Sequence, residues 1–163
     1  MLPNKEDIAK QVGIGAVIYA NLCNSRIKDI DFSFDRALDF IGETGPYVQY
    51  THVRCCSVLR RAEKLSLPAA DYTALTDDIS HTVLLQISRF PHVIREAAAK
   101  YEPFIITRAV SELCHAYNLF YRENRILDDT PAVSAARVQL TQAVKHLIKR
   151  GLYLIGMEAP EQM

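Results

Sequence analysis

Residues 42–64, GETGPYVQYTHVRCCSVLRRAEK, constrain the fold most, because they predict one helix with two different faces. The pair Gly45-Pro46 favours a helix start, since Pro at the first helical position gives up an amide that would have no partner there. With about 100° between successive residues, two stripes lie about a third of a turn apart. The apolar stripe contains Val48, Cys55, Leu59 and Ala62, and the aromatic and basic stripe contains Tyr47, Tyr50, Arg54, Val58 and Arg61.

The aromatic and basic stripe of this helix has two interpretations. Phenol rings followed by guanidinium groups suit unstacked bases and phosphates, so the stripe is a candidate RNA-binding surface. The same residue types also fit partly buried tyrosines with solvated hydroxyl groups and arginines that meet only water. Spacing by itself leaves both interpretations open.

The rest of the chain predicts an all-α fold, an antiparallel bundle of about six to seven helices whose short loops are marked by Pro. Besides the helix that begins at Gly45, helices are expected over residues 5–21, 69–88, 91–100, 104–123 and 131–154, with a short one ending at residue 40. Gly13 and Gly15 weaken the first helix and indicate close packing against another element. Gly156 favours a left-handed stop after the last helix.

One segment departs from the helical pattern. Residues 27–34 alternate between apolar and polar side chains, which predicts a short extended segment. A lone strand does not stabilise itself, so we expect this segment to pack on helices of this chain or on sequence beyond it.

Composition bounds the class of protein. A chain of 163 residues, 49% of them hydrophobic, can bury a core as one domain or as one domain with an extra arm. No apolar run is long enough to cross a bilayer, and the N-terminus MLPNKEDIAKQ is too polar for a signal peptide. We therefore expect a cytoplasmic protein without a membrane partner.

Charge is balanced overall but segregated locally. The 19 basic and 19 acidic residues cancel, so the whole chain has no general attraction to nucleic acid. Two clusters are mainly basic: Arg54, Arg60, Arg61 and Lys64 in one, and Lys145, Lys149 and Arg150 with His146 in the other. The first permits a local positive patch, and a solvated helix face explains the second equally well.

Patterns of catalytic and metal-binding residues do not occur in the sequence. The four cysteines form no C-x-x-C and the five histidines are scattered, which indicates reduced thiols and no metal site. The sequence has no Gly-rich phosphate loop, no nucleophile elbow and no assembled Ser/His/Asp pattern. We therefore predict no catalytic residue and no cofactor for this chain.

Four stretches of the sequence, in order along the chain, resemble one known family. GETGPYVQYTHVR at 42–54 is similar to the segment that opens the C-terminal helical domain of arginyl-tRNA synthetases, the DALR anticodon-binding domain. Upstream, residues 12–40 resemble the stretch that leads out of the catalytic domain of those enzymes. Downstream, NLFYREN at 118–124 and residues 143–163 resemble the last two helices and the C-terminal end of the family.

The resemblance implies a division of labour within a larger enzyme. It implies a connection from a catalytic domain over residues 1–41 and a helical anticodon-binding domain over residues 42–163. The H-x-G-H and K-M-S-K-S signatures of class I synthetases are absent from this sequence. The parent would be an ATP-dependent arginine–tRNA ligase of protein biosynthesis that uses ATP and magnesium, and this chain alone is expected to be non-catalytic, as an excised fragment or a free-standing relative.

The resemblance also implies individual tRNA-binding residues. Tyr47, Gln49, Tyr50 and Arg54 fall on the PY-x-QY-x-H-x-R segment of the family, which faces the anticodon loop. The remaining matched positions are a basic residue of the same helix, an aromatic on the penultimate helix and the terminal methionine, here Arg60, Tyr121 and Met163. The helical wheel differs at one point, because it places Arg61 instead of Arg60 on the tyrosine stripe. Without the resemblance, Tyr121 fits the edge of a core and Met163 a frayed end.

Two functions follow as hypotheses. The first is binding of the anticodon stem-loop of arginine tRNA by a monomer, with its own catalytic domain as the other partner. The alternative is a helical protein–protein adaptor that uses the same aromatic and basic face on an acidic partner. Preference for arginine tRNA over other tRNAs distinguishes the two, whereas steep salt dependence fits both.

Overall fold

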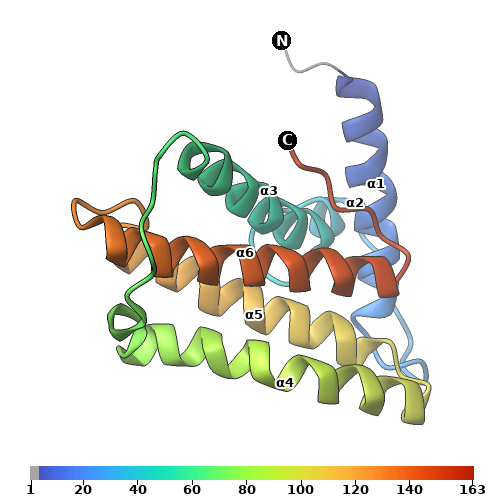
Figure 1. Cartoon of the computed structure of the whole chain (residues 1–163). Helices are drawn as coiled ribbons and strands as arrows, with labels where there is room; N and C mark the ends of the chain where they lie inside the picture. The colour runs from blue at the N-terminus through green and yellow to red at the C-terminus, as the bar shows by residue number, and fades with distance from the viewer. Residues whose placement is uncertain (1–3) are drawn as a thin grey trace.

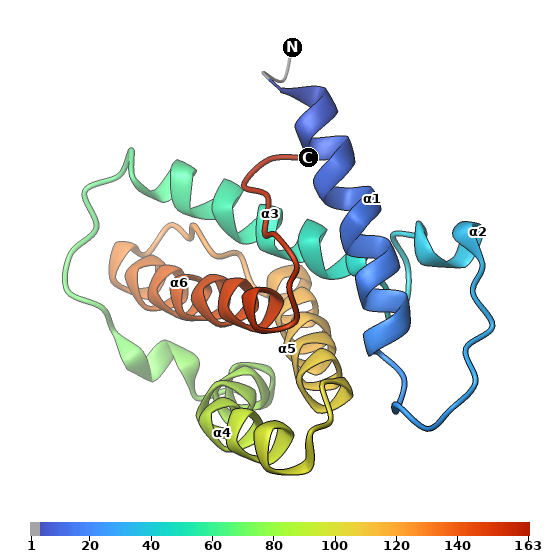
Figure 2. The same ribbon diagram turned by 90° about the vertical axis from the view of Figure 1, so that its right-hand side faces the viewer.

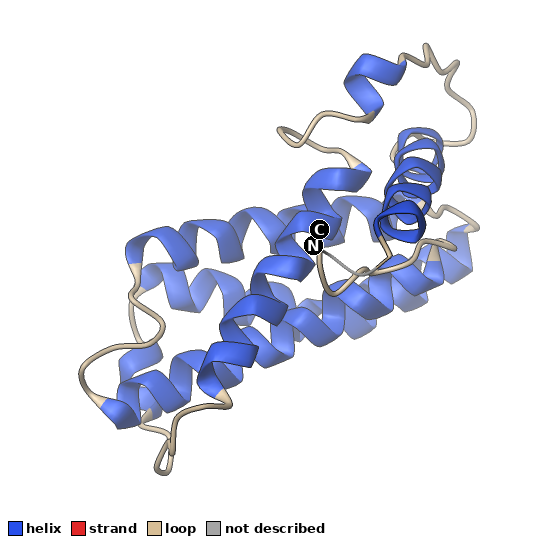
Figure 3. Ribbon diagram, turned by 90° about the horizontal axis from the view of Figure 1, so that it is seen from above, coloured by secondary structure: helices blue, strands red, loops and turns tan. Residues whose placement is uncertain are grey.

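A computed structural model describes residues 4–163, which form a bundle of α-helices without any strand (Figures 1 and 3). The elements are α1 (Lys5–Leu22), α2 (Phe34–Ala37), α3 (Gly45–Ala62), the 3-10 helix η1 (Tyr72–Leu75), α4 (Asp78–Lys100), α5 (Phe104–Glu123) and α6 (Pro131–Leu154). The prediction of an all-α fold is confirmed. No helix within residues 4–163 is both long and apolar enough to cross a membrane.

Capping residues explain where the main helices begin and end. The Oγ1 atom of Thr44 accepts a hydrogen bond from the Tyr47 amide at 3.2 Å, and Pro46 occupies the first turn of α3. The carboxylate of Asp77 accepts the amides of Ile79 and Ser80 at the start of α4, 3.1 and 3.0 Å away. Gly156, with φ of +78°, terminates the last helix in the left-handed conformation that the sequence predicted.

The expectation of two helices over residues 69–100 is wrong. Residues 78–100 form the single helix α4, and Pro91 lies inside it instead of opening a new helix. A Pro within a helix removes one hydrogen bond at a cost of about 3 kcal/mol. Here α4 packs along α5 over its length, and Phe90 beside the Pro is buried, so tertiary packing offsets the lost bond.

The predicted extended segment is also not a strand. Residues 29–33 form a loop without regular hydrogen bonding, although Ser33 has extended backbone angles. The rings of Phe32 and Phe34 pack edge to face, 5.0 Å between centroids, while 65% of Phe34 stays exposed. The alternation of apolar residues therefore reflects a loop with exposed rings, and not one face of a sheet.

Helix α1 is packed into the same core as the rest of the bundle. It crosses α3 where Gly15 meets Gly45, and a Cβ atom on Gly45 would lie 2.8 Å from the Gly15 carbonyl oxygen (Figure 2). Tyr19 is 1% exposed, and its hydroxyl donates to the Thr107 carbonyl of α5 at 3.2 Å. Residues 1–3 of the predicted 1–41 unit lie outside the described range. A boundary at residue 41 stays a prediction, but the described part of that unit shares its core with α3 and α5.

Candidate nucleic-acid interface

An arginine lies between two tyrosine rings on the surface formed by α3 and α5. The Cζ atom of Arg54 is 5.2 Å from the ring centroid of Tyr50, one turn earlier on α3. It is 4.8 Å from the ring centroid of Tyr121, which comes from α5. Both distances are typical of cation–π contacts. The structure therefore brings together three predicted site residues from two helices.

Asn118 holds this arginine in place and is a residue that the sequence analysis missed. The guanidinium of Arg54 donates to the Oδ1 atom of Asn118, which lies one turn before Tyr121. The Nδ2 atom of Asn118 donates to the Tyr47 hydroxyl at 2.9 Å and to Thr51 Oγ1 at 3.0 Å. The amide orders the guanidinium, since both of its ends are bonded. In the sequence, only the place of Asn118 at the start of the NLFYREN segment could have pointed to it.

The two outer rings are accessible to a ligand, while Tyr47 supports them. Tyr50 and Tyr121 are 44% and 38% exposed, so neither is a core residue. Tyr47 is half-buried, and its ring lies 5.1 Å from that of His115. Burial raises the pKa of Tyr47, which keeps its phenol neutral and able to accept from Asn118.

Phe40 extends the row of exposed rings beyond the predicted residues. Its ring packs edge to face on Tyr50, 6.3 Å between centroids, and it is 51% exposed. A turn brings it there, because the Thr44 hydroxyl donates to the Asp39 carbonyl at 2.5 Å and Gly42 has φ of +89°. The sequence placed Phe40 in the 1–41 connection, and only its closeness to the start of α3 pointed to this surface.

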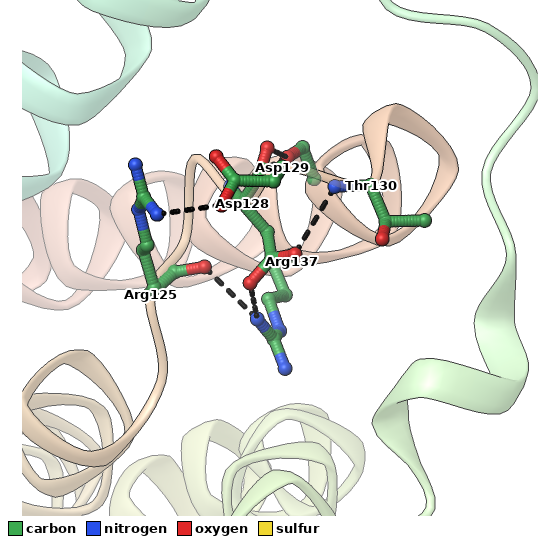
Figure 4. Close-up of polar contacts among 6 residues, drawn as sticks. Arg125, Asp128, Asp129, Thr130 and Arg137 are labelled. Atoms are coloured by element: carbon green, nitrogen blue, oxygen red, sulfur yellow. Dashed lines mark hydrogen bonds and ion pairs between the residues drawn. The ribbon is translucent and has the colours of Figure 1, made fainter.

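The polar loop after α5 fixes the end of the helix that carries Tyr121 (Figure 4). Arg137 of α6 donates to the Arg125 carbonyl at 2.9 Å and contacts the Asp128 carboxylate at 3.4 Å. Arg125 pairs with Asp129 at 3.0 Å, and Asp128 accepts the Thr130 amide at 3.1 Å. These contacts join the end of α5 to the start of α6.

Gln49 is placed differently from the other predicted residues. It is completely buried, and its Nε2 atom donates to the carbonyls of Gln11 and Glu158, 3.3 and 3.0 Å away. On the helical wheel it lies about 100° from Tyr50. A contact between Gln49 and RNA stays an untested prediction, and the contacts observed are with protein backbone.

Arg60 contacts the C-terminal tail, which carries Met163, and not the tyrosine cluster. Arg60 donates to the Glu161 carbonyl at 3.0 Å, and Met163 is partly exposed at the chain end. The second basic cluster meets this tail as well, since Lys145 and Lys149 lie 3.7 and 3.8 Å from the Glu161 carboxylate. Arg61, the alternative from the helical wheel, is exposed.

His52 of α3, which faces the tail, is another residue that the sequence analysis missed. It is completely buried, and its Nδ1 atom lies 2.8 Å from the Pro160 carbonyl oxygen. A carbonyl only accepts, so Nδ1 carries the proton. Burial lowers the pKa of His52, and the nearby charges of Lys145 and Lys149 lower it further. The hydrogen bond to Pro160 and the carboxylate of Glu161 oppose this shift, and the net pKa is lowered.

This environment makes a pH-dependent contribution to stability. The unfolded chain binds a proton at His52 near pH 6.5, and the folded chain does so only at lower pH. The free energy of unfolding should therefore fall as the pH drops below about 6.5 and level off below the folded pKa. Urea titrations from pH 7.5 to 5 should show a smaller fall for His52→Asn than for wild type. Equal pH dependence of the two proteins would contradict a buried neutral His52.

The thiols and acidic residues form no further site in the described residues. All four cysteines are free, and Cys55, Cys56 and Cys114 are buried. Burial raises the pKa of Cys55 to about 12, so its thiol is protonated at neutral pH. Residues 4–163 bring no three His, Cys, Asp or Glu side chains together in an arrangement that could hold a metal ion.

The described residues thus form an all-α domain that presents exposed rings and an ordered arginine across two helices. The profile of the family described as the DALR anticodon binding domain matches residues 48–163. The chain belongs to this family, as its motifs predicted.

Two similar relatives are arginine–tRNA ligases of which this chain covers a part. It is 51% identical over 162 residues to the arginine–tRNA ligase of Halothermothrix orenii, which covers 99% of this chain and 29% of that protein. It is 49% identical over 160 residues to that of Clostridioides difficile, with 98% and 28% covered. The chain therefore spans less than a third of the length of these curated relatives.

Solved structures show the same fold. The arginyl-tRNA synthetase of Thermus thermophilus superimposes with a TM-score of 0.91 and 30% identity, over 99% of this chain and 28% of that one. The arginyl-tRNA synthetase of Plasmodium falciparum gives a TM-score of 0.84 over 98% of this chain and 29% of its own; at 24% identity, this supports the fold alone.

Proposed function

We propose that this chain binds the anticodon stem-loop of arginine tRNA, as the anticodon-binding domain of an arginine–tRNA ligase. The observation that carries the proposal is the guanidinium of Arg54 held between the exposed rings of Tyr50 and Tyr121. Family membership and the arginine–tRNA ligases among the relatives support the choice of RNA.

The chemistry of this surface is recognition without catalysis. Exposed rings stack on unpaired bases, and Phe40 lengthens the row that offers such stacking. Arg54 uses one of its donors on Asn118, and the others are available to a phosphate or a base edge. In a cytoplasmic ligase, binding here orients the acceptor end of the tRNA toward a catalytic domain, where ATP and magnesium act.

A competition experiment tests the proposal. A labelled arginine tRNA bound to the chain is displaced by unlabelled arginine tRNA or by another tRNA, at two salt concentrations. We expect arginine tRNA to compete better at both salt concentrations, because contacts to the anticodon bases distinguish one tRNA from another. Phosphate contacts, which salt weakens, carry no sequence information. Equal competition by all tRNAs would contradict specific anticodon binding and favour the protein–protein adaptor.

Removing either outer ring should weaken binding without unfolding the protein. Tyr50→Ala and Tyr121→Ala each lose a stacking surface, at a cost of about 1–3 kcal/mol in binding free energy. The melting temperature should change little, because both side chains are exposed. Tyr153→Ala is the matched control, as an exposed tyrosine of α6 outside the cluster. A variant that mainly lowers the melting temperature would identify its tyrosine as a core residue.

A further inference from the structure

The seven residues at the C-terminus, 157–163, are held along one side of α3. After Gly156 the chain reverses direction and runs back between α1 and α3 (Figure 2). The amide of Met157 still bonds to the Leu152 carbonyl of α6, at 2.9 Å. Beyond Met157 this tail makes no backbone–backbone hydrogen bond with the residues described, so side chains must hold it.

Three side chains of α3 donate to three carbonyls of the tail in matching order. Gln49 donates to Glu158 at 3.0 Å, His52 to Pro160 at 2.8 Å, and Arg60 to Glu161 at 3.0 Å. The helical wheel places these three donors within about 80° of one another. The tail consequently has one register along α3.

Burial and ion pairs reinforce this register. Met157 is 4% exposed and Pro160 is buried, so the tail contributes to the core as it passes α3. The Glu161 carboxylate lies within 4 Å of Lys145 and Lys149 of α6. The last firmly held residue is therefore Glu161, and Met163 follows two residues later.

The tail is anchored at Arg60, which lies on the same exposed side of α3 as Tyr50. An extended residue advances at most about 3.6 Å, so Met163 stays within roughly 7 Å of the anchored Glu161 backbone. On the wheel, Arg60 lies about 80° to one side of Tyr50, and Arg54 about 40° to the other. The tail and the arginine–tyrosine cluster thus lie on the two sides of one strip of helix.

We propose that Gln49, His52 and Arg60 are positioning residues that hold the tail so that Met163 forms one border of the RNA-binding surface. The inference rests on the proposed function, and it gives a role to two buried polar residues that do not reach the surface. A tail that is already ordered loses less conformational entropy on binding RNA than a free one. We call the three side chains Gln49, His52 and Arg60 the latch. By ordering the tail, the latch raises the affinity for RNA without a contact of its own to RNA.

The experiment is a double-mutant cycle with the tail. His52→Phe removes the donor and keeps a ring, whereas His52→Asn keeps a donor near the Nδ1 position. Each is made in the full chain and in a chain without residues 162–163. The measured quantities are the affinity for a synthetic arginine-tRNA anticodon stem-loop, the melting temperature, and hydrogen exchange of the C-terminal peptide.

We expect His52→Phe to weaken binding roughly three- to tenfold in the full chain, the range for one lost hydrogen bond, and to speed exchange in the tail. His52→Asn should restore both. In the truncated chain His52→Phe should change affinity by less than twofold, because the residue that the latch positions is gone. The same loss in both chains, or a freed tail with unchanged affinity, would overturn the inference.

A second pair of variants avoids any change in the core. Arg60→Ala and Arg61→Ala remove the same charge from exposed neighbours, but only Arg60 holds a tail carbonyl. Faster tail exchange and a truncation-dependent loss of affinity are expected for Arg60→Ala alone, and identical behaviour of the pair would contradict the latch. If wild type and every tail-contact variant bind the stem-loop with the same affinity, the inference about the tail is wrong and the proposed function stands. A wild type that binds no stem-loop overturns both.

Discussion

Arg54→Ala should weaken binding of the arginine-tRNA anticodon stem-loop by about 2 kcal/mol, roughly thirtyfold. The substitution removes a cation held between two exposed rings. The rings of Tyr50 and Tyr121 therefore lose the group that fixes their orientation, and the surface loses a positive charge. The substitution also leaves the Oδ1 atom of Asn118 without its donor, because the Arg54 guanidinium is the group that donates to it. Affinity measured by fluorescence anisotropy over a series of salt concentrations checks the prediction.

The salt series also identifies what Arg54 contacts. If Arg54 binds a phosphate, the slope of log affinity against log salt should become shallower by about 0.7–0.9. If it binds a base edge, discrimination between tRNAs should fall while the slope stays nearly constant. Arg54→Lys keeps the charge without the planar group, so it should preserve the slope and still lose affinity. Unchanged affinity and slope in Arg54→Ala would remove this face from the RNA-binding surface.

Gly45→Ala should lower the free energy of unfolding by about 1–3 kcal/mol, the usual cost of overpacking. The added Cβ atom would lie 2.8 Å from the Gly15 carbonyl oxygen and 3.1 Å from the Ala16 Cα atom. Both are backbone atoms of α1, so the contact is relieved only if two helices move apart. Urea denaturation measures the change directly.

Gly13→Ala is the matched control for the helix crossing. Gly13 lies in α1 two residues before Gly15, and a Cβ atom there would meet nothing within 4 Å. Ala is a better helix former than Gly, so this variant should be stabilised by about 0.5–1 kcal/mol. Similar destabilisation by both substitutions would contradict a specific contact between Gly15 and Gly45.

Local pattern was sufficient where a feature depends on neighbours along one helix. The two stripes of α3 follow from its periodicity, and the start at Gly45-Pro46 follows from the missing amide of Pro. The glycines of α1 pointed to close packing, and the crossing occurs at Gly15, although the partner helix was not predictable. The starts of α5 and α6 at Pro103 and Pro131 were also predicted, and so was the stop of α6 at Gly156, since these residues act through the local backbone.

Local pattern failed where tertiary packing competes with propensity. Pro91 predicts a helix boundary, but the contacts of α4 with α5 and α6 keep one helix across it. The alternation at residues 27–34 predicts an extended segment with a face to pack, and the structure has a loop with exposed rings instead. In both cases the deciding contacts come from elsewhere in the chain.

The sequence by itself determined that this chain forms helices, that α3 carries tyrosines and arginines on one stripe, and to which family it is similar. Only the tertiary structure decided that Tyr121 closes over Arg54, that Asn118 orders the guanidinium, and that Gln49 and His52 face the tail instead of solvent. The physical reason is distance along the chain. Helical periodicity relates residues within a few turns, whereas these contacts join residues from 64 to 109 positions apart, and the packing of α5 and the tail on α3 creates them.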